Sequence, residues 1–190
     1  MRFFIIAFSF LGLVACTVDK ESKITLDKLK VRNSIRDSLR QVLRDSVLNS
    51  SRVGDGGLQT PEYRRVSWII KTSDNEELKE MARSDNSFIK AIGFHGLFLK
   101  QDKEWFDNLV PMLQDTGEYV AYQEGCFRFN YQLPKYCLLE ILRYETMDGI
   151  LTKKQTNEID RLIEKYKIRV RPKQTATNSS YLQLRGLVLN

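Results

Sequence analysis

Residues 87–99 form the most apolar helical stretch of the chain, and they constrain the fold more than any other segment. The stretch follows Asp85 and Asn86, polar residues that favour the start of a helix. Its apolar side chains would fall on nearly every side of a helix, whereas a surface helix has a single apolar face. We therefore expect a central helix that other elements cover on all sides. Its apolar residues are Phe88, Ile89, Ala91, Ile92, Phe94, Leu97, Phe98 and Leu99.

Helix signals recur on both sides of this stretch. Several polar residues stand directly before runs of helical apolar periodicity, where a helix begins. In two cases a Glu or Gln follows three residues later, as in a capping box. These patterns predict an all-α chain. The signals are Thr60-Pro61, Asp74 with Glu77, Asp102, and Thr152 with Gln155, and a further helical run covers residues 133–144.

Two of the expected helical segments resemble each other at an offset of thirty residues. Apolar residues precede Asp85, and Ile89-Lys90-Ala91 follows it; residues 109–113 precede Asp115, and Val120-Ala121 follows it. The pattern is similar to the HEAT repeat family, and more closely to uncharacterised HEAT-like proteins of Bacteroidetes-type bacteria. The resemblance covers about residues 76–143. It implies a short helical-repeat (α-solenoid) domain that acts as a binding scaffold, and it implies no chemistry.

The first sixteen residues have the layout of a secretory signal. Arg2 precedes an uncharged run that ends at Ala15 and is too short to span a bilayer. The sequence Leu13-Val14-Ala15-Cys16 resembles the lipobox of bacterial lipoproteins, in which the cysteine is acylated after cleavage. The resemblance implies a lipid on Cys16 and a place in the bacterial cell envelope, facing the periplasm or the surface. Thr17 after the cysteine resembles outer-membrane sorting. The alternatives are an ordinary signal peptide and a buried N-terminal strand.

The segment before the main domain has the pattern of one long amphipathic helix. Apolar residues recur every three to five positions, and basic residues recur every fourth position to form a cationic side. Arg36 and Arg40 of this row are candidate binding residues. The helix packs on the domain, pairs with another copy, or holds the domain off the membrane. We expect a signal peptide over residues 1–15, a tether over 16–23, this helix over 24–52, a linker over 53–60 and a HEAT-like domain over 61–190.

Basic residues gather at the two ends of the chain. Residues 165–190 hold six Lys or Arg and no Asp or Glu, whereas residues 53–164 hold fourteen against nineteen. Basic and apolar residues alternate from residue 165 onward, which predicts a short extended strand with one basic side. Such a strand is a candidate surface for an acidic partner or for anionic head groups, and the alternative is a solvated tail. Its basic residues are Lys165, Lys167, Arg169, Arg171 and Lys173.

Two features stay open at the level of sequence. Residues 118–132 hold five aromatic residues that suit either an irregular helix or a short extended piece, and Gly125 interrupts either. Cys126 and Cys137 either form a disulfide, as an exported chain allows, or serve as apolar fillers. Cys137 lies in an apolar helical run, which favours the second alternative.

Support for enzyme chemistry is weak. His95 is the only histidine, and it lies in the most apolar helix, where a packed core histidine is the expected state. The chain has no cysteine pair at zinc spacing and no glycine-rich phosphate loop. We therefore expect no catalytic residue, no metal, no cofactor and no nucleic-acid partner. The expected function is that of a lipid-anchored module that binds another envelope protein. The alternatives are an immunity-type lipoprotein that neutralises a toxin, and an envelope enzyme or polymer binder that uses the basic C-terminal segment.

Overall fold

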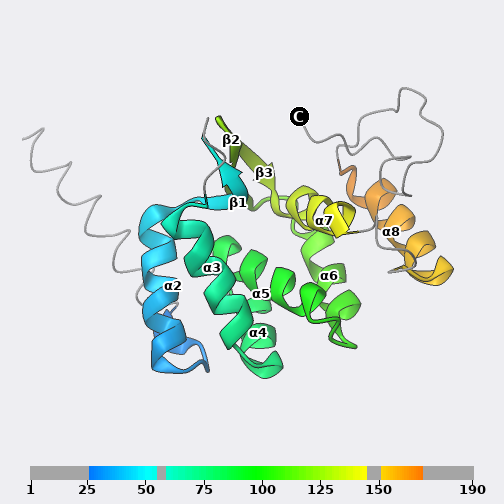
Figure 1. The fold of residues 1–190 in the computed structure, drawn as a ribbon. Helices are drawn as coiled ribbons and strands as arrows, with labels where there is room; N and C mark the ends of the chain where they lie inside the picture. Colours follow the sequence, from blue (N-terminus) through cyan, green and yellow to red (C-terminus); the bar gives the residue numbers. More distant parts are fainter. Residues whose placement is uncertain (1–25, 55–58, 145–150, 169–190) are drawn as a thin grey trace, which may run out of the picture.

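The computed structural model describes residues 26–54, 59–144 and 151–168. Helices and a small sheet make up this part of the chain (Figure 1). In chain order the elements are α2 (Asn33–Asp45), β1 (Leu48–Val53), α3 (Pro61–Thr72), α4 (Asn75–Ala82), α5 (Ser87–Leu99), α6 (Trp105–Gln114), β2 (Tyr119–Gly125), β3 (Phe127–Gln132), α7 (Leu133–Tyr144) and α8 (Lys153–Tyr166).

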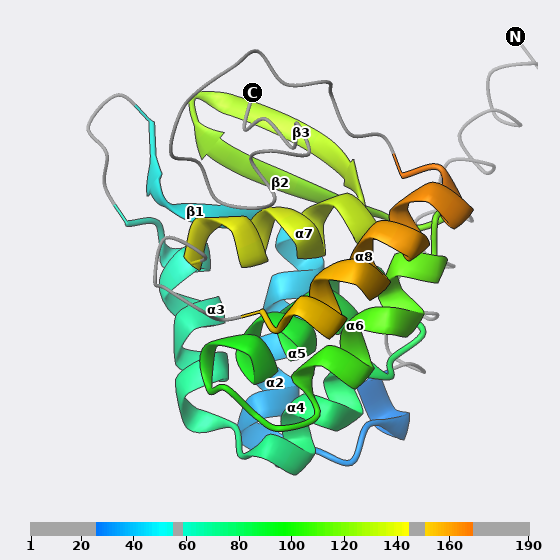
Figure 2. The same cartoon turned by 90° about the vertical axis from the view of Figure 1, so that its right-hand side faces the viewer.

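The expectation of an all-α solenoid is wrong, because a three-stranded sheet accompanies the helices. The strand order is β1-β2-β3, with β1 parallel to β2 and β2 antiparallel to β3. The sheet lies at one end of the helices, and α7 runs along it (Figure 2). The protein therefore combines a layer of helices with a small mixed sheet.

The second half of the apparent repeat folds differently from the first. In the first unit α4 and α5 form the expected pair of helices. In the second unit α6 supplies one helix, but Val120 lies in β2 where the resemblance places a second helix. Lys90 Nζ pairs with Asp115 Oδ2 at 2.7 Å and with Glu118 Oε1 at 3.2 Å, so it holds the turn after α6 against α5. The thirty-residue offset therefore reflects two similar helix ends. It does not reflect a repeated helical hairpin.

Residues 118–132 adopt the extended alternative. Gly125 has a φ of 56°, in the left-handed region that glycine adopts readily, and together with Cys126 it connects β2 to β3. Tyr122 pairs with Phe129 across these strands, and Leu48 of β1 lies beside Tyr122 on the other side. The aromatic residues with a period of two are therefore strand residues.

Residues 24–52 do not form one long helix. α2 ends at Asp45, Ser46 adopts a left-handed conformation with a φ of 50°, and β1 begins at Leu48. The apolar face of α2 packs against α3 and belongs to the main core, so the helix is part of the domain and no separate arm. β1 takes residues 48–53, which the sequence assigned to the helix and the linker. The buried residues of α2 are Ile35, Leu39 and Val42.

α5 is the central helix, as the sequence predicts. Most of its side chains are buried, and it contacts α3, α4, α6, α7 and β2. Asn86 caps its first turn, because its Oδ1 accepts hydrogen bonds from the backbone N–H groups of Phe88 at 3.1 Å and Ile89 at 3.2 Å. The remaining helices and the sheet are arranged around α5.

α4 and α5 approach each other so closely that no side chain fits at Gly93. A Cβ atom there would lie 2.6 Å from the backbone oxygen of Leu78 and 2.7 Å from the backbone carbon of Met81. Gly96, nearly one turn further along, faces the side chain of Leu78. These two glycines let the two helix backbones meet, and α4 with α5 makes the most extensive contact between any two elements.

A second fixed contact joins α2 to α4. Glu77 accepts hydrogen bonds from the backbone N–H of Arg32 at 2.8 Å and from its Nε and Nη2 at 2.9 Å and 2.7 Å. It also accepts one from the N–H of Asp74 at 3.1 Å, which completes the predicted capping box. The carboxyl group of Glu77 is buried, and its hydrogen bonds from the Arg32 side chain lower its pKa to about 2. The N-cap residue of α2, Arg32, makes no capping hydrogen bond with its own side chain. Glu77 of α4 caps α2 instead, because it accepts the hydrogen bond of the Arg32 backbone N–H.

We predict that Gly93→Ala lowers the free energy of unfolding by about 3 kcal/mol, because the new methyl group meets the backbone of α4, which cannot rotate away. Gly117→Ala is the matched control. No atom lies within 4 Å of a Cβ at Gly117, and a change there is expected to stay within about 0.5 kcal/mol. Urea denaturation of both variants is the measurement. Equal stability of the two variants would contradict the close contact of α4 and α5.

Glu77 also predicts a pH dependence of stability. Its pKa is about 2 in the folded protein against an ordinary value of 4.5, so its stabilising contribution is complete above pH 4.5 and is lost as the pH falls toward 2. The difference in unfolding free energy between the wild type and Glu77→Gln should therefore be largest near neutral pH and shrink below pH 4.5. Urea denaturation across this pH range measures it. Glu164→Gln, on an exposed position of α8, should show no such trend.

Candidate functional site

Some of the candidate residues lie outside the part of the chain that the structure describes. These are Cys16 with the signal segment 1–15, and Arg169, Arg171 and Lys173 near the C-terminus. Within residues 26–54, 59–144 and 151–168, no helix combines the length and the apolar character that crossing a membrane requires. The remaining candidates lie on α2, α7 and α8 and at the β2–β3 turn.

The predicted basic strand does not begin at Lys165. This residue lies in α8, and its Nζ is 5.0 Å from the centroid of the Tyr166 ring. Lys167 ends the helix in a left-handed conformation with a φ of 51°, and the buried side chain of Ile168 follows. Lys165 and Lys167 are therefore exposed basic residues at the end of a helix, and they do not lie on one side of a strand.

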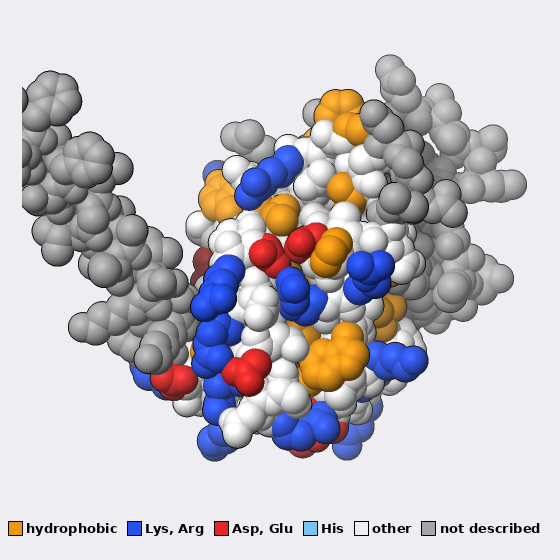
Figure 3. All heavy atoms as spheres, turned by 60° about the vertical axis from the view of Figure 1, so that its left-hand side comes forward, with side chains coloured by type: hydrophobic (Ala, Val, Ile, Leu, Met, Phe, Trp, Pro, Cys, Tyr) orange, Lys and Arg blue, Asp and Glu red, His pale blue; other side chains and the backbone are white. Residues whose placement is uncertain are grey.

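Arg36 and Arg40 both lie on α2, where each has local partners. Arg36 donates hydrogen bonds to the backbone oxygens of Leu26 at 3.2 Å and Leu29 at 2.9 Å, so it fixes the segment that leads into the helix. Arg40 Nη1 pairs with Asp37 Oδ1 at 2.5 Å. Basic side chains form a column over this face of the molecule (Figure 3). The structure thus gives Arg36 a role in the fold and leaves it within a positively charged surface.

No disulfide joins Cys126 to Cys137. Cys126 is exposed at the β2–β3 turn, whereas Cys137 is fully buried on α7 with its Sγ 3.7 Å from the Sδ of Met112. Burial raises the pKa of the Cys137 thiol well above its usual value, which keeps it protonated. Cys137 therefore acts as an apolar filler, the second of the two alternatives.

A pocket of about 480 Å³ opens between the sheet and the helices α3, α5 and α7. We call it the sheet pocket. β1 contributes Leu48 and small polar side chains to its wall, and the other elements contribute aromatic, ionisable and apolar ones. Its volume is in the range of small-ligand sites. The lining residues that matter most below are Asn49, Ser67, His95, Tyr122, Tyr136 and Glu140.

His95 on α5 and Glu140 on α7 lie close together beside the sheet pocket. Glu140 Oε2 lies 3.3 Å from His95 Nε2. Glu140 is only 3% exposed, and the side chain of His95 is 17% exposed. Removing a carboxylate from water costs several kcal/mol unless a partner compensates it. Two ionisable groups that the fold holds together in this way beside a pocket are candidates for contact with a ligand.

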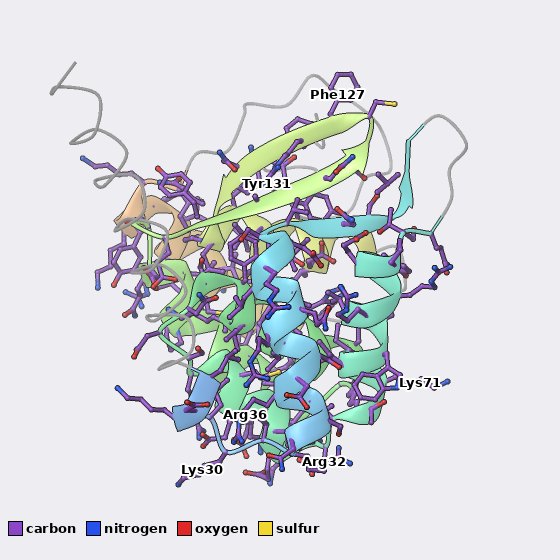
Figure 4. The ribbon with its side chains drawn as sticks, turned by 90° about the vertical axis from the view of Figure 1, so that its left-hand side faces the viewer. Lys30, Arg32, Arg36, Lys71, Phe127 and Tyr131 are labelled. Atoms are coloured by element: carbon purple, nitrogen blue, oxygen red, sulfur yellow. The ribbon has the colours of Figure 1, made fainter. Side chains whose placement is uncertain are left out.

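Five aromatic rings, which we call the aromatic row, lead from the tip of the β2–β3 hairpin to the sheet pocket. Phe127, Phe129 and Tyr131 alternate along β3, with ring centroids 6.3 Å and 5.3 Å apart. Tyr122 lies 6.1 Å from Tyr131, and Tyr136 lies 5.7 Å from Tyr122. Phe127 is 68% exposed, whereas Tyr136 is buried. Figure 4 shows Phe127 at the far end of the hairpin and Tyr131 nearer its base.

The aromatic row and the sheet pocket share Tyr122 and Tyr136, so the packed rings connect the hairpin to the wall of the pocket. Aromatic rings offer large contact areas at little cost in side-chain entropy, and the His95–Glu140 pair adds directional polar contacts. Among the described residues, no three His, Cys, Asp or Glu side chains are grouped so that they could hold a metal ion. What this surface offers chemically is recognition through ring stacking and hydrogen bonds.

The sequence does not single out Glu140 and treats His95 as a packed core residue. A signal for the pair is nevertheless present, because each is an ionisable residue with apolar residues close by on both sides in the sequence. Two such groups in buried helices are expected to meet, since each is costly alone. Tyr136 is expected on the core face of its helix, and only the position of the sheet shows that it also lines a pocket.

Comparison of the chain with protein-family models, with curated proteins and with solved structures finds no match in any of the three.

Proposed function

We propose that this protein is a lipid-anchored module of the bacterial cell envelope that binds another envelope protein through its β2–β3 hairpin. It acts without catalysis of its own. The observation that carries the proposal is the aromatic row on β3, which ends in the 68% exposed ring of Phe127. Large exposed aromatic side chains are enriched where proteins bind each other.

The backbone of β3 gives a second reason to propose the β2–β3 hairpin as the binding surface. β3 is the last strand in the order β1-β2-β3, so one of its edges has no neighbouring strand among the described residues. An edge strand can receive an extended segment of a partner by backbone hydrogen bonding, while the side chains select the partner. Arg128 and Asn130 are also exposed on this strand, and they present polar groups on the face opposite Phe127 and Phe129.

The position of the anchor suits this arrangement. Cys16 and Leu26 are ten residues apart, so the described part of the chain begins at most about 36 Å from the acylated cysteine. Lys30, Arg32 and Arg36 lie at one end of the molecule, and Phe127 lies at the opposite end (Figure 4). With the basic end against anionic head groups, which attract each cation by about 1 kcal/mol, the hairpin points away from the membrane.

The first test of the proposal is acylation. Cys16→Ser should move the protein out of the membrane fraction or leave its precursor uncleaved, because the lipid that anchors it can no longer be attached. Fractionation followed by mass spectrometry of the intact protein measures both effects. A wild-type protein with an unmodified cysteine, or with Met1 still present, would show that the anchor is absent.

The second test concerns the hairpin. Phe127→Asp should lower the recovery of the partner in a crosslinking pulldown from envelope membranes by about tenfold, which corresponds to about 1.4 kcal/mol of lost affinity. The side chain is exposed, so the melting temperature should not change. Mass spectrometry of the captured protein then distinguishes an assembly partner from a toxin.

Lys154→Asp is the control for the hairpin test. It also introduces an acidic residue at an exposed position, but on α8. We expect it to leave the recovery of the partner unchanged. If Phe127→Asp and Lys154→Asp recover equal amounts of the same partner, the hairpin is not the binding surface.

A further inference from the structure

The sheet pocket has the features of a built ligand site that the proposed protein-binding surface does not require. Glu140 and His95 are held 3.3 Å apart by two different helices, and both line the pocket. A further polar group, Oδ1 of Asn49, is buried and has no hydrogen-bond partner among the described residues. The amide nitrogen of Asn49 is fixed by a 2.9 Å hydrogen bond to Thr60 Oγ1. The pocket therefore has an oriented acceptor available for a ligand.

Charged groups of both signs line the pocket. Glu140 and Glu124 are acidic, while Lys71 is basic and His95 pairs with Glu140. An anionic ligand would meet the two carboxylates, and a cationic ligand would meet Lys71. Because specificity arises as much from what a site repels as from what it attracts, this lining favours a ligand without net charge.

The other lining residues indicate what kind of neutral ligand fits. Hydroxyl groups that can both donate and accept hydrogen bonds surround the pocket, and the half-buried ring of Tyr63 adds an apolar face. A sugar ring has the matching properties, with an apolar C–H face and a rim of hydroxyl groups. A carboxylate such as that of Glu140 has two oxygens and can accept from two adjacent sugar hydroxyls. The hydroxyl-bearing residues are Ser50, Ser51, Ser67, Tyr63, Tyr122 and Tyr136.

We propose that the sheet pocket binds a neutral saccharide. The volume of about 480 Å³ corresponds to about 16 waters at roughly 30 Å³ each, which leaves room for a mono- or disaccharide. A sugar ring packs against the half-buried ring of Tyr63, and its hydroxyls donate to Glu140 and to Asn49 Oδ1. This binding is independent of the hairpin tip, because the exposed ring of Phe127 does not line the pocket.

The test uses the purified full-length protein in detergent and saturation-transfer NMR. The neutral probes are glucose, galactose, N-acetylglucosamine and cellobiose, and the charged comparators are choline and glucuronate. We expect at least one neutral sugar to bind with a Kd of about 1 mM or tighter and the comparators to give no signal. Glu140→Gln, which keeps the shape of the side chain, should raise the Kd for that sugar by about tenfold. Glu164→Gln on α8 should leave the Kd unchanged.

A second variant tests the proposal in case Glu140→Gln does not fold. Ser67→Phe adds a ring at a half-buried position of α3 that lines the pocket, and it should abolish sugar binding while the melting temperature and the Phe127-dependent capture of the partner remain. The proposal is overturned if no neutral sugar binds, if choline or glucuronate binds more tightly than every neutral sugar, or if Ser67→Phe leaves sugar binding unchanged.

Discussion

The contact between α4 and α5 at Gly93 is the constraint on which the rest of the structure depends. It holds one side of the central helix against the backbone of α4, with Leu78 and Met81 within reach of any added methyl group. An α-helix turns by about 100° per residue, so His95, two positions later, points about 200° away from Gly93. The side of α5 opposite α4 is thereby directed toward α7, where Glu140 Oε2 lies 3.3 Å from His95 Nε2.

The position of Glu140 depends in turn on the β2–β3 hairpin. β3 runs directly into α7 at Leu133, so the register of the hairpin sets where the helix begins. Tyr136 and Glu140 are four residues apart and share one face of α7, which faces the sheet pocket. Cys137 is on a different face and packs against Met112. One helix therefore contributes the polar and aromatic wall of the pocket and part of the apolar core.

The two ends of the molecule differ in chemistry, and the fold explains why. At one end Glu77 caps α2 by binding Arg32, and Arg36 fixes the segment before that helix, so the basic side chains there are ordered by the fold itself. At the other end the β2–β3 hairpin carries aromatic rings, with Phe127 at its tip (Figure 4). The basic residues and the exposed aromatic ring therefore lie at opposite ends of the molecule.

The sequence alone determined most of the helices, because helix formation is local. Asp74 with Glu77 and Thr152 with Gln155 form capping boxes as their spacing predicts, and the apolar residues of 87–99 form the buried α5. Only the tertiary structure decided the strands and the site. β1 pairs with β2 across more than seventy residues, Leu48 beside Tyr122, and no local pattern encodes such a partner. The same holds for His95 and Glu140: each is visible as an ionisable residue among apolar neighbours, but their contact depends on packing that brings distant helices together.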